Sequence, residues 1–353
     1  MIPERLTLIV VMSCLGGACT WNNYDGTSDA GDGGPGDGGP RDAASTDGAF
    51  DAGAKPAKMP APMRDMGVYV AKDGKIYVLG GRDAQGKASK AVNVYDPAKN
   101  TWTATFEMST ARYALGVGAF MDDKIIALGG FDDGGNAVDV VEVRDSFSGA
   151  WTLGTPMPTP RGAFAASTVP GEVVVLGGTA SENGTPIGKT DWFQNNGTWS
   201  NVALLPMPTP RAWLGASWSP NGGTLAMGGA PSWATVEAFD AVQNKWTTTA
   251  SSMTTGRGHF ATTQGCAGSK CMQTFVVGGR SGTAVVNAFE VYDPSANAWT
   301  PLPPMPTARE GLVAAYVGSG AFAYVMAIGG YDGVNTLDIV ETYNVESKTW
   351  IQK

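Results

Sequence analysis

Short apolar stretches alternate with polar turns along most of this chain, and one of them recurs. Residues 75–81 read KIYVLGG, an apolar run closed by two glycines. Five later stretches have the same form, and the first glycines of all six are Gly80, Gly129, Gly177, Gly228, Gly278 and Gly329. The steps between them are 49, 48, 51, 50 and 51 residues. A fixed period of about 50 residues predicts a repeat fold of six units over residues 60–353.

Each repeat contains the same parts in the same order. An arginine precedes a small apolar strand, a turn and the strand that ends in Gly-Gly; a polar loop, a third strand and a tryptophan strand follow. The arginines are Arg64, Arg112, Arg161, Arg211, Arg257 and Arg309, and the tryptophans are Trp102, Trp151, Trp199, Trp246, Trp299 and Trp350. Four short strands separated by turn residues predict one four-stranded antiparallel blade per repeat, and hence an all-β fold.

The recurring motifs resemble kelch repeats. They are the Gly-Gly ends, the pairs Tyr95-Asp96, Tyr292-Asp293 and Tyr343-Asn344, and a tryptophan seven residues after each of these tyrosines. The resemblance implies a six-bladed kelch-type β-propeller. It is loosest in the second repeat, which has 143–145 VRD, and in the third, which has 192–194 WFQ. Because the first repeat starts at its arginine and the last ends at its tryptophan, we expect each blade to consist of contiguous chain.

An arginine present in every blade is expected to be structural. We predict that the six arginines anchor the starts of the strands by binding backbone carbonyls and neighbouring carboxylates. Residues that break the repeat are better candidates for a site.

The N-terminal residues 1–19 have the pattern of an export signal. A basic start is followed by a short apolar run and small residues before Cys19, and the run is too short to span a bilayer as a permanent helix. Residues 15–19, LGGAC, resemble a bacterial lipobox, which implies that Cys19 is lipidated. Cys14 is the competing site, and an ordinary cleaved signal without lipid is the alternative. Thr20 resembles the outer-membrane sorting pattern of lipoproteins, so we expect an exported, lipid-anchored protein of the bacterial outer membrane or cell surface.

Composition changes the picture in three places. Residues 20–59 are rich in Gly, Asp, Ala and Pro, which predicts a disordered tether. The net charge of −8 implies no basic face, so nucleic acid is not expected as a partner. Cys266 and Cys271 lie in a predicted hairpin of the fifth repeat, where a disulfide is expected in an exported protein. We expect the chain to be a monomer.

Candidate ligand-binding residues follow from the resemblance. In kelch propellers, ligands commonly lie over one end of the central channel, where the loop after Gly-Gly and the residue after the repeated arginine meet them. Carried onto this chain, the arginine loops give Asp65, Tyr113, Gly162, Ala212, Gly258 and Glu310, with Trp213 and His259 one residue further on. The loops after Gly-Gly give Arg82, Asp83, Phe131, Asp132, Asp133, Thr179, Ser232, Trp233, Arg280, Tyr331 and Asp332. This mixture of aromatic and charged groups suits a protein or a glycan ligand.

The residue inventory limits the possible catalysis. Galactose oxidase shares the propeller, but its copper needs two histidines, and His259 is the single histidine of this chain. A three-ligand zinc site is equally short of ligands, so no metal and no cofactor is expected. We therefore predict a non-enzymatic binding module of the cell envelope. The alternative is a metal-free carbohydrate-active enzyme, like the kelch-type sialic acid epimerases, in which Glu310 near Arg257 and Arg309 acts as an acid or base.

Overall fold

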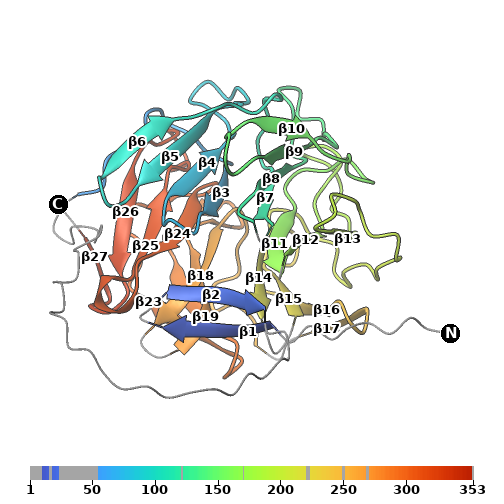
Figure 1. Cartoon of the computed structure of the whole chain (residues 1–353). Coiled ribbons are helices and arrows are strands. Elements are labelled where there is room, and N and C mark those ends of the chain that lie inside the picture. Colours follow the sequence, from blue (N-terminus) through green and yellow to red (C-terminus); the bar gives the residue numbers. More distant parts are fainter. Residues whose placement is uncertain are drawn as a thin grey trace, which may run out of the picture.

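A computed structural model describes residues 55–351, apart from 121, 170, 220–222, 249–250 and 268–269 (Figure 1). It also assigns two paired strands near the N-terminus, β1 (Val10–Leu15) and β2 (Ala18–Asn23). The predicted tether over residues 20–59 lies outside the described residues except at 20–23 and 55–59, and the Cys19 side chain also lies outside them. No helix among the described residues has the length and apolar character needed to cross a membrane.

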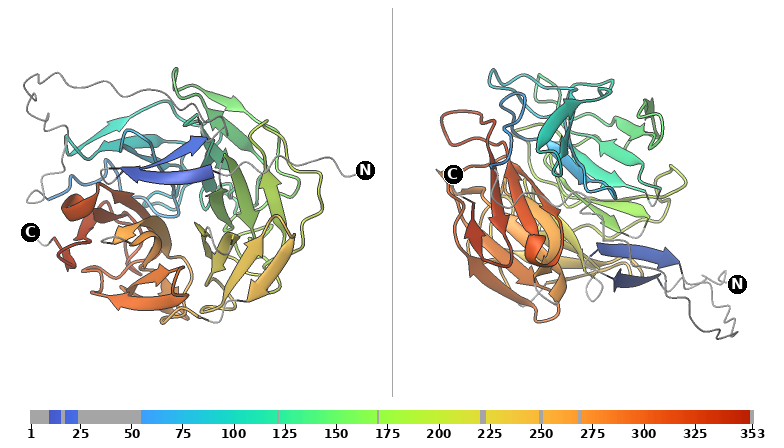
Figure 2. Two further views of the ribbon diagram at one scale, coloured as in Figure 1. Left: turned by 60° about the horizontal axis from the view of Figure 1, so that its bottom comes forward. Right: turned by 60° about the vertical axis from the view of Figure 1, so that its left-hand side comes forward.

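The described chain forms six small antiparallel sheets arranged as blades around a central channel (Figure 2). Blade one comprises β3 (Gly67–Val70), β4 (Ile76–Leu79), β5 (Val92–Asp96) and β6 (Thr101–Ala104). Blade two comprises β7 (Gly116–Ala119), β8 (Ile125–Leu128), β9 (Val141–Arg144) and β10 (Trp151–Leu153). Blade three comprises β11 (Ala165–Val169), β12 (Glu172–Leu176) and β13 (Thr190–Phe193).

The other three blades complete the ring. Blade four comprises β14 (Gly215–Ser219), β15 (Gly223–Met227), β16 (Val236–Asp240) and β17 (Lys245–Thr248). Blade five comprises β18 (Ala261–Ala267), β19 (Lys270–Val277), β22 (Phe289–Asp293) and β23 (Ala298–Leu302), with the short ladder β20 (Arg280–Ser281) and β21 (Ala284–Val285) in its loop. Blade six comprises β24 (Val313–Val317), β25 (Tyr324–Ile328), β26 (Val340–Asn344) and β27 (Thr349–Trp350), with the 3-10 turn η1 (Gly320–Phe322) between its first two strands.

The predicted six-bladed propeller is thus confirmed. The prediction of four strands per blade holds for five of the six blades. Blade three has three strands, and its fourth is reduced to a single bridge between Phe193 and Trp199. The turn before Trp199, 194–198 QNNGT, is followed by only one residue that pairs with β13.

The second strand is the most buried one in blades one, two, three and six. In β12 the residues Val173 to Leu176 are all 0% exposed, and β8 has a similar apolar run. Such a strand lies inside its sheet and is covered by blades on both faces, so it shows a continuous apolar run rather than alternation. The fourth strand lies at the outer edge of its blade, and most of its residues are exposed, as in β6.

Blade closure uses contiguous chain, as the sequence predicts. Every sheet consists of strands from one repeat, so no strand is exchanged between the termini. Blade one packs on blade six through a shared core that includes Met59, Met63 and Met326. The segment just before the predicted boundary is part of this closure, because Trp102 Nε1 donates to the Ala57 carbonyl at 3.0 Å. The ordered body therefore begins before Pro60.

Five of the six repeated tryptophans bind the segment that leads into their own blade. Trp151 Nε1 donates to the Phe106 carbonyl at 2.9 Å, and Trp246 Nε1 donates to the Leu205 carbonyl at 2.9 Å. Each acceptor lies two residues before a buried methionine, Met108 or Met207, at the start of the same repeat. The indole ring thus fills the wedge between blades and also satisfies a loop carbonyl.

Five repeated arginines are structural, as predicted. Arg112, Arg161, Arg211, Arg257 and Arg309 are each 0% exposed. Arg211, for example, donates to the carbonyls of Gly228 at 2.7 Å and Thr235 at 2.8 Å. Burial lowers the pKa of Arg112 to about 10, and the attraction of Glu142 opposes that shift. These guanidiniums hold the interior of their blades rather than a ligand.

Arg64 is not the sixth member of this set, which corrects the sequence prediction. The Gly330 amide donates to the Met63 carbonyl, as the Gly81 amide donates to the Arg112 carbonyl. Met63 therefore occupies the buried arginine position in blade one. Asn93 pairs with Val78 in blade one as Glu142 pairs with Ala127 in blade two, so the buried carboxylate is also absent there.

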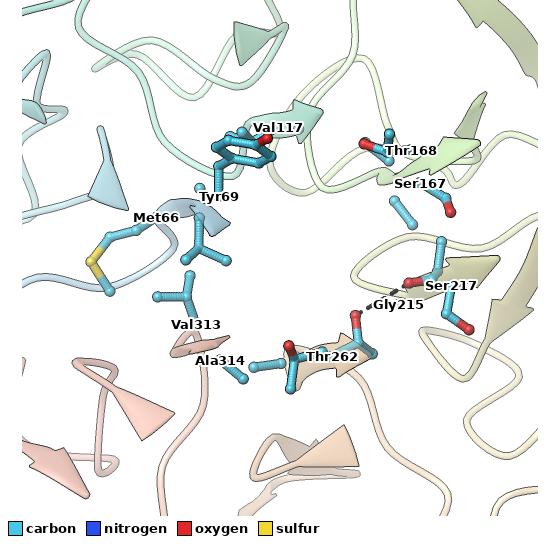
Figure 3. Close-up of a pocket in the computed structure, with 18 of the residues that line it drawn as sticks. Met66, Tyr69, Val117, Ser167, Thr168, Gly215, Ser217, Thr262, Val313 and Ala314 are labelled. Carbon is cyan, nitrogen blue, oxygen red and sulfur yellow. Dashed lines mark hydrogen bonds between the residues drawn. The ribbon is translucent and has the colours of Figure 1, made fainter. Parts of the chain in front are cut away.

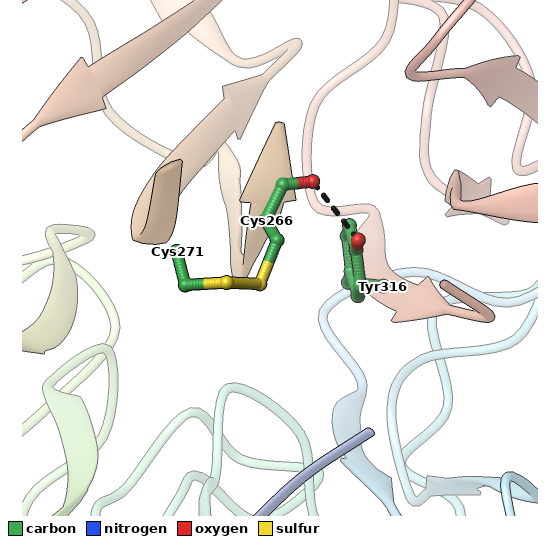
Figure 4. The surroundings of a disulfide bond; sticks show 3 residues. All are labelled: Cys266, Cys271 and Tyr316. Atoms are coloured by element: carbon green, nitrogen blue, oxygen red, sulfur yellow. Dashed lines mark hydrogen bonds between the residues drawn. A yellow bond between two sulfur atoms is a disulfide. The ribbon is translucent and has the colours of Figure 1, made fainter. Parts of the chain in front are cut away.

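Cys266 and Cys271 are joined by a disulfide near the end of the β18–β19 hairpin (Figure 4). The Tyr316 hydroxyl of blade six donates to the Cys266 carbonyl at 2.9 Å. The hairpin is therefore tied both across its own strands and to the next blade.

Candidate functional site

A closed ring of backbone hydrogen bonds lies at one end of the channel, at the start of the innermost strands. One residue of each blade donates its amide to the carbonyl of the corresponding residue in the preceding blade. The donors and acceptors are Asp65 to Gly311 (2.7 Å), Ala114 to Asp65 (2.7 Å), Ala163 to Ala114 (3.0 Å), Trp213 to Ala163 (2.7 Å), His259 to Trp213 (3.0 Å) and Gly311 to His259 (2.8 Å). This ring, called the backbone ring below, links all six blades without a shared strand.

Every member of the backbone ring has a left-handed backbone conformation. The φ angles are 55° for Asp65, 50° for Ala114, 55° for Ala163, 57° for Trp213, 53° for His259 and 60° for Gly311. This region is disfavoured for residues with a Cβ atom, and bulky side chains are rare in it. The hydrogen-bonded ring requires the conformation at all six positions, whatever side chain stands there.

The backbone ring separates two spaces. On its inner side lies the central channel, a cavity of about 470 Å³ lined by the innermost strands of all six blades (Figure 3). Ser167, Ser217 and Thr262 place hydroxyls on one wall, while Val117 and Val313 make the opposite wall apolar. At the ring itself only a hollow of about 120 Å³ remains.

The surface called the rim below comprises six bridged pairs of residues outside the backbone ring, together with the side chains of Asp65, Glu182, Trp213 and His259. The pairs are Arg64 with Arg82, Tyr113 with Phe131, Gly162 with Thr179, Ala212 with Ala230, Gly258 with Arg280, and Glu310 with Tyr331. The first member of each pair precedes a ring residue, and the second follows Gly-Gly. In blade one this position belongs to Arg64, so Asp65 is a member of the backbone ring and not the counterpart of Tyr113.

Arg82 joins three blades at this rim. Its Nη2 lies 2.9 Å from Asp65 Oδ2, and its Nη1 lies 2.6 Å from Glu182 Oε1 of blade three. The guanidinium also lies 4.0 Å from the ring centroid of Tyr113, whose hydroxyl donates to Glu182 Oε2 at 2.9 Å. Burial acts to lower the pKa of Arg82, but the attraction of Asp65 and Glu182 together outweighs it and the pKa is raised. This cluster presents a fixed cation with two carboxylates.

A second ion pair lies across the rim, in blades five and six. Arg280 binds both carboxylate oxygens of Glu310. Hydrogen bonding to Glu310 raises the pKa of Arg280. Arg64 completes this side, with its guanidinium 4.5 Å from the ring centroid of Tyr331.

The predicted grouping of Glu310 with Arg257 and Arg309 is not found. Arg257 binds Glu290 and Arg309 binds Glu341, each inside its own blade. Glu310 instead lies in the rim ion pair with Arg280. An acid–base role for Glu310 would require that pair to open.

Trp213 and His259 stack on each other between the two ion pairs. Their ring centroids lie 3.9 Å apart with an interplanar angle of 11°, and both side chains are half-buried. Burial lowers the pKa of His259, an effect that Asp65 and Glu310 oppose and that Arg280 reinforces. The imidazole is therefore neutral at pH 7 and offers one donor and one acceptor nitrogen.

Other predicted rim residues support the loops. Oδ1 of Asp132 accepts from the amides of Gly134 and Asn136, and Oδ1 of Asp332 accepts from Val334 and Asn335. Phe131 is 0% exposed.

Trp233 is half-buried and also has a structural contact. Its carbonyl accepts from the Arg257 amide at 2.7 Å.

Glu182 and Arg64 are rim residues that sequence reasoning missed. Glu182 lies in the third loop after Gly-Gly, where it has no counterpart in the other repeats. A methionine precedes the buried arginine by four residues in five repeats, and this spacing identifies Met63 rather than Arg64 as the blade-one equivalent. Among the described residues no group of three His, Cys, Asp or Glu side chains could hold a metal ion.

Comparisons with known proteins agree with this architecture. The model of the Kelch motif family matches residues 63–105 and 273–306, which lie in blades one and five. A solved structure titled "Structure of YjhT" aligns with a TM-score of 0.67 over 84% of this chain and 98% of that chain, at 13% identity. At this identity the likeness concerns the fold alone. The chain is a six-bladed β-propeller with kelch motifs.

Proposed function

We propose that this protein is a non-enzymatic binding module that captures a partner through the rim outside the backbone ring. The partner is a protein or a glycan that offers polar groups together with a flat apolar surface. The rim supplies the matching groups as Arg82 with Glu182, Arg280 with Glu310, and the stacked rings of Trp213 and His259.

The observation that carries this proposal is the placement of Trp213 and His259 in the backbone ring. The repeats provide an internal comparison, because blades two and three have alanine at this position and blade six has glycine. The ring geometry therefore does not require a large side chain. Two half-buried rings in a disfavoured conformation, side by side over the channel, are expected where a surface is selected for binding.

The charges of the rim favour binding over acid–base catalysis. The Glu310 carboxylate is held by Arg280, and both Asp65 and Glu182 are held by Arg82. Paired carboxylates of this kind orient polar partners, whereas a general acid needs a carboxyl with a raised pKa. The paired carboxylates thus suit a binding surface rather than the active site of a carbohydrate-active enzyme.

The N-terminal sequence supports a proposed location at the bacterial cell envelope. An N-terminal export signal with lipidation at Cys19 and a tether up to the propeller would hold the rim clear of a membrane surface. This supports a role at the bacterial cell envelope, where the partner would be sought.

The test is capture of material from a cell-envelope extract by the immobilised full chain. Trp213→Ala and Arg280→Ala are compared with Lys99→Ala, whose side chain is 75% exposed in a turn at the opposite end of the blades. We expect both rim variants to lose capture and Lys99→Ala to retain it, with all variants folded by circular dichroism. Capture that survives both rim substitutions would overturn the proposal.

A further inference from the structure

A second cavity lies between blades three and four, which are neighbours in the ring (Figure 2). It has a volume of about 540 Å³. Its walls come from the far ends of β11 and β14, the starts of β12 and β15, and the turn between β16 and β17. These ends point away from the backbone ring. The cavity, called the interblade cleft below, is therefore separate from the rim.

Two tryptophans line the interblade cleft from opposite blades. Trp192 of β13 lies on the same face of the blade-three sheet as Val174 and Leu176 of β12, which pack against blade four. Trp218 lies two residues after Ala216 and four after Leu214, both of which pack against blade three. Because side chains two residues apart point to the same face of a strand, both indoles face the boundary between these blades.

The other blades show that neither tryptophan is needed to build a propeller. The positions that correspond to Trp192 are Val94, Val143, Ala238, Val291 and Thr342. Those that correspond to Trp218 are Val70, Ala119, Thr168, Gln264 and Tyr316. Two large rings thus coincide at one interface of the six, and they line a cavity there instead of closing it.

The exposed part of Trp192 is its carbon surface. The side chain is only half-buried, but its Nε1 atom is buried and lies towards the Glu172 carboxyl. Trp218 is also half-buried. The cleft therefore offers flat apolar surfaces to a ligand.

Polar groups stand beside these rings. Glu172 lines the cleft, and burial raises the pKa of its carboxyl, while the neighbouring Trp192 indole opposes that shift. Asp240 and the exposed Lys245 lie across from it at the turn of blade four. Two carboxylates against one ammonium disfavour an anionic ligand, and carboxylates accept hydrogen bonds from hydroxyls.

We propose that the interblade cleft binds a neutral oligosaccharide. The C–H faces of pyranose rings pack on indole carbon surfaces, and their hydroxyls donate to carboxylates such as that of Glu172. The volume exceeds that of a single water-sized void and lies in the usual range of small-ligand sites, from about 300 to 1,000 Å³. This site is distinct from the rim and goes beyond the proposed function.

The test uses neutral hexasaccharides of glucose, xylose, mannose and N-acetylglucosamine as probes, titrated into the full chain and followed by calorimetry. We expect at least one to bind, and Trp192→Val and Trp218→Val to weaken it by about tenfold or more. These two changes install residues that other blades carry at the same positions, so the propeller should fold. Glu172→Gln keeps the shape of the side chain and should weaken binding less.

Trp213→Ala is the matched control, because it removes a tryptophan from the rim and leaves the cleft intact. We expect it to retain oligosaccharide affinity within about twofold of the unaltered chain. The proposal is overturned if no probe binds up to about 10 mM. It is equally overturned if binding survives the two cleft substitutions together, or if Trp213→Ala abolishes it, since the rim would then be the site. Loss of rim capture with intact cleft binding bears only on the proposed function.

Discussion

The guanidinium of Arg211 lies 2.8 Å from the carboxylate of Glu237, and both side chains are buried inside blade four. The corresponding pair in blade one is Met63 and Asn93, neither of which is charged. One chain thus contains two solutions for the same position. Removing one partner of a buried ion pair is costly because the other charge remains in a site without water.

We therefore predict that Arg211→Met lowers the free energy of unfolding by about 3–5 kcal/mol, because Glu237 is left unpaired. Arg211→Met combined with Glu237→Asn copies blade one and should recover most of that loss. Urea unfolding of the single and double variants measures both values. A double variant no more stable than the single one would show that the pair is required in this blade.

We predict that exchanging alanine and glycine has different effects on stability at two positions of the backbone ring, Gly311 and Ala163. At Gly311 an added Cβ would lie 2.5 Å from Asp65 Oδ1, so Gly311→Ala should displace that carboxylate from Arg82. We expect a loss of about 1–3 kcal/mol in the free energy of unfolding. Ala163→Gly is the matched control, because it relieves a left-handed alanine and should change stability by less than about 1 kcal/mol. Thermal unfolding distinguishes the two, and equal effects would argue against a crowded contact at Asp65.

The chain has a single histidine, so the charge state of the His259 imidazole can be measured directly. Burial lowers the pKa of His259, so the unfolded chain binds the proton more readily than the folded one. The free energy of unfolding should therefore fall as the pH is lowered through about 6.5, the pKa of unperturbed histidine, towards the folded-state value. Titration of the imidazole resonances by NMR should give a midpoint below about 6.5. A midpoint above that value would contradict the buried, neutral imidazole.

The disulfide between Cys266 and Cys271 closes a short loop at the end of blade five remote from the rim. Replacing both cysteines with serine should lower the free energy of unfolding by about 2 kcal/mol, because short loops restrict the unfolded chain only modestly. Capture at the rim should be unchanged. Chemical unfolding and the capture assay measure the two effects, and loss of capture in a folded variant would place the hairpin in the binding surface.

The fold could be read from the sequence because its signals repeat. Gly-Gly ends such as Gly129-Gly130 and tryptophans such as Trp151 recur in register, since each fills the same place in every blade. In blade one the repeat pattern points to Arg64, one residue beyond Met63, which is the true counterpart of the buried arginines. Met59 shows the correct register, because in the other five repeats a methionine also stands four residues before the buried arginine.

The rim could be predicted only in part. The repeat places Arg82 and Trp213 there, because the loops that bear them stand at fixed positions in it. The contact between Arg82 and Glu182 joins blades one and three across 100 positions of sequence (182 − 82), and it arises only when the ring closes. The backbone ring is equally invisible in the sequence, because its residues share a conformation and not a side chain.

The most direct test of the rim as the binding surface is site-specific crosslinking in a cell-envelope extract. A photoreactive phenylalanine analogue is placed either at Tyr331, on the rim, or at Phe147, which is 98% exposed in a turn at the opposite end of blade two. We predict that the probe at Tyr331 forms a specific adduct, that Trp213→Ala abolishes this adduct, and that the probe at Phe147 forms none. An adduct from Phe147 alone would contradict the account.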